Sequence, residues 1–159
     1  MQTTFETPTL EDRRLAILAH GSILLTFLIA VTTGGIGTLV GVLVPFFIWL
    51  IYRDRSPYVA FHALQATLYQ IGLISLFLAV ALMAAIILAV AWVITALLSA
   101  LIVGLILVPV AILLTVIAAL VLATFPLAGL AYGLAAAWEV YNSDHFRYQW
   151  VADWLEQRV

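Results

Sequence analysis

Two histidines inside otherwise apolar segments are the residues with the most evident capacity for chemistry. His20 and His62 each follow an arginine, Arg14 and Arg55, by six or seven positions. At about 1.5 Å of helix rise per residue, both imidazoles lie roughly 10 Å beyond those arginines and at the same depth. Two facing imidazoles can bind haem iron, chlorophyll magnesium or a transition metal. The alternative, which we favour, is that each makes one hydrogen bond between helices.

Other polar side chains lie near the two histidines and extend this level. Gln65 and Gln70 follow His62 in the same segment, while Ser22 and Thr26 follow His20. Amides and hydroxyls cannot stay unpaired in lipid, so we expect a polar cluster that joins the first helix to the third. A small hydrated vestibule is the alternative. The cluster comprises His20, His62, Gln65 and Gln70.

The residues needed for catalysis are missing from these segments. Ser22, Ser75 and Ser99 have no Asp or Glu nearby in sequence to orient a general base, and the chain has no cysteine. No carboxylate within the apolar segments completes a metal site, and no basic cluster indicates nucleic acid. The sequence therefore predicts no enzyme, no metal site, no nucleic-acid partner and no cofactor, with haem or chlorophyll on His20 and His62 as the alternative.

Composition indicates a protein that is dissolved in lipid. The chain is 66% hydrophobic and 9% charged, and no Asp, Glu, Lys or Arg occurs from residue 56 to residue 138. Soluble domains are about 25% charged, and about 20 apolar residues suffice for one membrane crossing. We expect an all-helical transmembrane bundle with the lipid bilayer as its solvent.

The first half of the chain predicts a polar cytoplasmic tail over residues 1–14 and two spans. Thr9 and Asp12 have the spacing of a capping box, so a helix should begin near Leu10. The transmembrane domain then covers residues 15–141, with spans over residues 15–32 and 35–52 and a glycine turn between them. Gly37 and Gly41 are spaced for close helix packing, as are Gly129 and Gly133 in the last span.

Arginine placement sets the expected topology. Two spans separate Arg13 and Arg14 from Arg53 and Arg55, so all four lie on one side, the cytoplasmic side by the positive-inside rule. The N-terminus is then cytoplasmic, and the family resemblance described below implies a bacterial inner membrane.

The apolar run from Ile71 to Trp138 is longer than two ordinary spans require. Our interpretation is four spans plus an extra apolar segment near residues 88–108, either re-entrant or a short fifth span. A plain five-span chain is the alternative, and it would place the C-terminus on the opposite side.

The C-terminal segment, residues 142–159, has a different pattern. Trp150 and Trp154 are one helical turn apart, and Gln149, Asp153, Glu156 and Gln157 take the other face. This pattern predicts a short amphipathic helix in the headgroup region. The alternative is a helix packed on the protein's own loops.

Three stretches together carry a family resemblance. They are Leu18-Ala19-His20, then residues 48–59 with Phe61-His62-Ala63-Leu64-Gln65, and Phe146-Arg147-Tyr148. The chain resembles a bacterial domain-of-unknown-function family related to the chloroplast Tic import component of twenty kilodaltons. The resemblance implies four helices with both ends on one side, no known enzymatic activity and, in plastids, a part in protein import.

Three functions follow as hypotheses. The first is a non-enzymatic scaffold or accessory subunit that binds other membrane subunits or its own copies. The second is a translocation or permeation component, implied by the resemblance. The third is a haem- or chlorophyll-binding subunit that uses His20 and His62.

Overall fold

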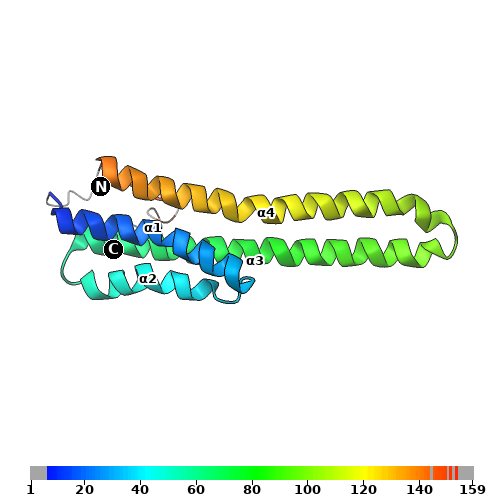
Figure 1. Ribbon diagram of the computed structural model, residues 1–159, viewed down its shortest axis with the longest axis horizontal. Coiled ribbons are helices and arrows are strands. Elements are labelled where there is room, and N and C mark those ends of the chain that lie inside the picture. The colour runs from blue at the N-terminus through cyan, green and yellow to red at the C-terminus, as the bar shows by residue number, and fades with distance from the viewer. Residues whose placement is uncertain (1–6, 144, 150, 152, 154–159) are drawn as a thin grey trace. The chain divides into compact units, whose positions relative to one another are not determined.

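The computed structural model describes residues 7–143, 145–149, 151 and 153, and the regular structure in them is helical. Four helices follow one another (Figure 1): α1 (Leu10–Thr33), α2 (Thr38–Tyr52), α3 (Pro57–Ser99) and α4 (Val103–Ser143). Three of them, α1, α3 and α4, are long and apolar enough to cross a membrane. The all-helical fold is as the sequence predicted, and α2 is the shorter helix, at 15 residues.

The polypeptide divides into two compact units, each built from parts of the long helices. The first unit contains residues 1–73 and 129–159, and the second contains residues 74–128. The first unit therefore holds α1, α2, the beginning of α3 and the end of α4. The second unit is a helical hairpin made of the remaining parts of α3 and α4.

The start of α1 confirms the capping box that the sequence predicted. The Thr9 hydroxyl accepts from the Asp12 backbone N–H at 3.1 Å, and the Asp12 carboxylate accepts from the Thr9 backbone N–H at 3.1 Å. These bonds satisfy two backbone donors that the first helical turn leaves free. At the other end Gly34 has φ 61°, a left-handed conformation that glycine adopts without steric cost, and α1 ends there.

Helices α1 and α2 form a closely packed antiparallel pair (Figure 1). The approach is closest at Gly41, where an added Cβ would lie 2.5 Å from the Thr26 Cα. Pro45 lies inside α2 and is buried. The glycine spacing thus falls at a point where two backbones come together, which is the use that small residues have in membrane helices.

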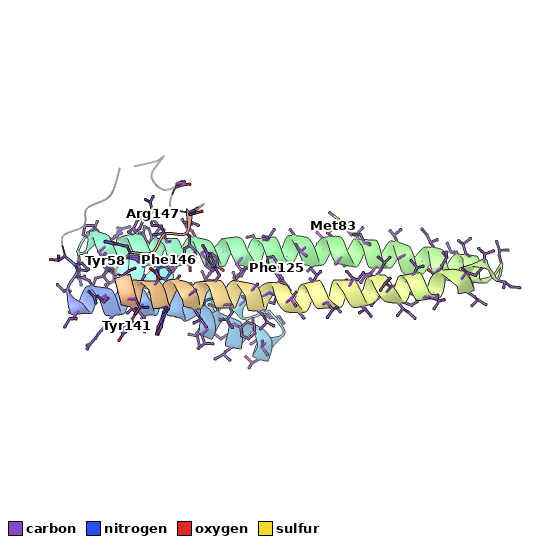
Figure 2. The ribbon with its side chains drawn as sticks, turned by 90° about the horizontal axis from the view of Figure 1, so that it is seen from above. Tyr58, Met83, Phe125, Tyr141, Phe146 and Arg147 are labelled. Atoms are coloured by element: carbon purple, nitrogen blue, oxygen red, sulfur yellow. The ribbon has the colours of Figure 1, made fainter. Side chains whose placement is uncertain are left out.

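Small side chains fill the core of the first unit. One cluster contains Ala16, Tyr58, Val59 and Val140, against which Phe146 packs (Figure 2). A second cluster contains Ala19, Ala63 and Ala66, with Ile48 and Trp49 packed on it. Alanine at these positions lets α1 and α3 approach closely enough for their polar side chains to meet.

The second unit is a hairpin whose two arms are the end of α3 and the beginning of α4. The indole of Trp92 donates to the Thr115 hydroxyl at 3.1 Å, and the ring centroids of Phe77 and Phe125 are 6.2 Å apart. Residues 88–108 are the end of α3, a turn at residues 100–102 and the start of α4. The separate re-entrant or fifth segment expected there is not confirmed, because the run from Ile71 to Trp138 turns once within the described chain.

We predict that Gly41→Leu destabilises the first unit. The new side chain meets the α1 backbone at Thr26, and overpacking of this kind costs about 1–3 kcal/mol. Thermal unfolding of the detergent-purified protein measures the loss. Gly21→Ala is the matched control, since a Cβ there has no atom within 4 Å and should leave stability unchanged or slightly higher. Equal melting temperatures for the two variants would contradict the proposed close contact.

Candidate functional site

A chain of three polar rings lies buried in the first unit. His20 Nε2 lies 3.2 Å from His62 Nδ1, and His20 Nδ1 lies 3.3 Å from the Tyr148 Oη. Helix α1 supplies His20, α3 supplies His62, and Tyr148 comes from the segment after α4. All three side chains are at most 3% exposed. Each ring nitrogen of His20 therefore has one partner, and neutral rings suffice for both contacts.

Gln65 connects the same C-terminal segment to α3. Its carboxamide oxygen accepts from the Tyr148 backbone N–H at 3.0 Å. The other half of the amide, Nε2, is buried and has no hydrogen-bond partner within the described part of the chain. One turn of helix separates Gln65 from His62, so both side chains lie on the same face of α3.

Aromatic rings enclose Tyr148. Its ring stacks on Tyr69 with centroids 4.2 Å apart and planes 4° from parallel, and Phe146 and Tyr132 contact it edge-on. Burial raises the pKa of the Tyr148 phenol well above its ordinary value, and the nearby Tyr69 and Tyr132 raise it further. Tyr148 is therefore a neutral phenol that can donate or accept a hydrogen bond at His20.

A second group of polar contacts lies further along the same two helices. The Thr26 hydroxyl donates to the Gln70 carboxamide oxygen at 2.7 Å, and Gln70 Nε2 donates to the Ser22 hydroxyl at 2.9 Å. The Ser22 hydroxyl in turn donates to the Ala19 carbonyl at 2.7 Å. The Gln70 amide thus bonds α1 through both its oxygen and its nitrogen.

Of the predicted polar cluster, His20, His62 and Gln70 meet at the contact between α1 and α3, and Gln65 bonds the segment after α4. The hydroxyl of Thr67, which lies on the same helix as Gln65, donates to its own helix at the Ala63 carbonyl. The hydrogen bonds of the cluster thus join α3 to α1 and to the C-terminal segment, and they include no charged group. Among the described residues no group of three or more His, Cys, Asp or Glu is placed to hold a metal ion.

His20 and His62 face each other directly, and this bears on the cofactor alternative. His20 Nε2 and His62 Nδ1 are engaged in the contact between the two rings. The rings lie edge-to-face, with centroids 5.4 Å apart. The ring of Tyr58 packs against that of His62, with centroids 4.5 Å apart. A haem or chlorophyll ligand role for these histidines stays a prediction.

The remaining residues singled out in the sequence have separate places. An added Cβ at Gly129 would lie 2.5 Å from Leu73, and one at Gly133 would lie 2.7 Å from Ile23, so α4 packs closely on α3 and α1. Gly37 lies near Ile29 at the end of α1.

Arg53 pairs with Asp54 at 3.3 Å in the exposed loop between α2 and α3. Trp150 and Trp154, with half of the expected amphipathic segment, lie outside the described residues.

Sequence reasoning gave Tyr148 no role in the cluster. It is 128 positions from its partner His20, and no periodic pattern relates a short segment after the last helix to the start of the first. The Phe146-Arg147-Tyr148 stretch attracted notice only within a family resemblance. A concentration of aromatic residues after a long apolar helix was the one available signal, and it was interpreted as an interfacial feature.

The fold and the site define an all-helical membrane protein whose buried polar groups join its helices. A family model, described as the magnetosome magnetite crystal formation protein family (MamF/MmsF), matches residues 11–155. The match covers most of the chain, which therefore belongs to this family. No curated protein and no solved structure matches the chain.

This match corrects the family expected from the sequence. The resemblance to the relatives of the chloroplast Tic import component was wrong, because the family that matches is the magnetosome family. The short stretches that suggested it include the buried residues His20, His62 and Gln65.

We predict that Tyr148→Phe lowers stability less than Tyr148→Ala. The phenylalanine keeps the ring stacked on Tyr69 and loses only the hydroxyl contact to His20, a loss of about 0.5–1.5 kcal/mol. The alanine also loses the buried ring. Thermal unfolding in detergent measures both, with Tyr141→Phe as control because Tyr141 is 59% exposed. Two variants with the same loss would show that the ring packing contributes nothing.

A double-mutant cycle on Thr26→Val and Gln70→Met should reveal direct coupling. The two side chains share a 2.7 Å hydrogen bond across α1 and α3, so their effects on the free energy of unfolding should not add. Measured couplings of this kind in membranes average about 0.6 kcal/mol and reach about 1.7 kcal/mol. Chemical denaturation in mixed micelles supplies the four values. The same cycle with Thr124→Val in place of Thr26→Val should give no coupling, since the Thr124 hydroxyl bonds only its own helix.

Proposed function

We propose that this chain is a non-enzymatic membrane protein that takes part in magnetite crystal formation, as a small scaffold or accessory subunit of the magnetosome membrane. The observation that carries the proposal is the family match over residues 11–155. The match includes all four helices, so the family relation concerns the fold as a whole rather than one motif.

The polar cluster supports a structural role for the first unit. His20, Gln65 and Gln70 are each at most 1% exposed, and their bonds run to other helices or to the segment after α4. Groups used in this way hold the helices and the C-terminal segment in one arrangement. A substrate or an iron ion would have to compete with these internal bonds, so we assign the cluster to assembly and not to catalysis.

In this proposal the protein acts on the crystal indirectly. Much of its described surface is aliphatic, including Leu78, Leu82, Ile106 and Leu113. We infer that the protein acts through the membrane around the crystal, and through other membrane subunits or copies of itself. The N-terminus is cytoplasmic in this proposal.

Gene replacement in a magnetite-forming bacterium tests the function. A strain that lacks its own family member is complemented with this chain, and crystal dimensions are measured by electron microscopy. We expect complementation to restore crystal size, and we expect purification from the magnetosome membrane to recover the chain with other membrane proteins. Crystals unchanged by the deletion, or a chain absent from the magnetosome membrane, would contradict the proposal.

The Tyr148→Ala variant sharpens this experiment. It should reduce both the amount of folded protein and the restoration of crystal size, since Tyr148 fixes the C-terminal segment to α1 and α3. Tyr141→Phe, which changes an exposed ring, should complement as well as the unaltered chain.

A further inference from the structure

The tip of the second unit is a turn without a polar side chain facing outward. It consists of Ala100, Leu101 and Ile102 between the two arms, followed by Val103. Leu101 is 69% exposed and Ile102 is 74% exposed. The loop between α2 and α3 differs sharply, because it contains the exposed ion pair of Arg53 and Asp54.

Several of the hydrogen bonds at the tip are made within the hairpin. The backbone N–H of Leu101 donates to the Leu98 carbonyl at 3.0 Å, and that of Ile102 donates to the Ser99 carbonyl at 3.1 Å. The Ser99 hydroxyl donates to the Thr95 carbonyl at 2.7 Å. Internal satisfaction is what a hydrocarbon environment requires of a backbone, since no water is present to supply partners.

Ile102 also has a backbone conformation that its type does not favour. Its φ is 67°, in the left-handed region, where a β-branched side chain is strained and glycine or asparagine is common. Isoleucine at this position gains nothing by burial within the unit, because it is mostly exposed. An apolar side chain placed at a strained turn points to an apolar environment around the turn.

The arms of the hairpin are apolar on every side. The most apolar 18-residue window of α3 contains no buried residue, and Met83, which points away from the ribbon in Figure 2, is 59% exposed. A helix that is apolar all round suits lipid, whereas a protein partner would need only one stripe. The exposed residues of the tip are aliphatic, without the Trp, Tyr or Arg anchors common at protein interfaces.

We propose that residues 100–106, the tip of the hairpin, form a lipid-contacting surface that stays among the acyl chains and does not emerge into water. Helix α3 has 43 residues, about twice the number that one crossing needs, so a tip that stays among the acyl chains requires α3 to tilt or bend in the membrane. The side chains and the internal bonds of the turn are the ground for the proposal. This inference concerns the membrane environment of the tip and does not rest on a role in crystal formation.

The chain contains no cysteine, so single cysteines can be introduced without removing any. Full-length Leu101→Cys and Asp54→Cys are treated with a membrane-impermeant maleimide in right-side-out and inside-out vesicles. We expect Asp54→Cys to react from one side, and Leu101→Cys to react from neither side until the membrane is dissolved in sodium dodecyl sulfate. Reaction of Leu101→Cys from either side of intact vesicles would overturn the proposal. Val103→Cys provides a second position should Leu101→Cys be poorly expressed.

A bimane fluorophore on the same cysteines distinguishes lipid from protein at the tip. In phosphatidylcholine vesicles with brominated acyl chains, the label on Leu101→Cys should be quenched by bromine and not by aqueous iodide. The label on Asp54→Cys should show the reverse. Absence of bromine quenching together with efficient cross-linking of Leu101→Cys into dimers would place a second copy at the tip, and would overturn the assignment to lipid.

Discussion

Hydrogen-bonding groups that are withdrawn from water must bond to one another, and in the first unit they do so between α1 and α3. His20 meets His62, and Gln70 meets both Ser22 and Thr26. Each contact fixes the rotation of one helix against the other, because a small turn of either would leave several groups unpaired. The alanines between these positions allow the approach, and Tyr148 closes the cluster from the segment after α4.

In the second unit, most polar side chains find their hydrogen-bond partners within their own helix. Its hydroxyls donate to the carbonyls of their own helices, as Thr95 and Ser99 do, and the bond from Trp92 to Thr115 joins the two arms. Few of its polar contacts therefore join one helix to another, and its exposed surface is largely aliphatic. The chain thus combines a unit whose shape is determined by specific polar contacts with a hairpin that is suited to contact with lipid.

Membership of the magnetosome magnetite crystal formation family gives this division a context. Under the function proposed above, the first unit maintains a defined structure and the second unit fixes the protein in the membrane around the crystal. In this scheme the cluster of rings serves the assembly of the fold.

Sequence alone determined the helical class, the membrane environment, the start of α1 at its capping box and the loop at Arg53, because these depend on composition and on residues close together in the chain. It also indicated that His20 and His62 lie at one depth, since helix rise is constant. It did not determine the role of Tyr148, the division into two units or the single turn at residues 100–102. These depend on contacts between positions far apart in sequence, and a uniform apolar run contains no local signal of where it folds back. Tertiary structure decided them, because only the packed helices specify which polar groups are near enough to bond.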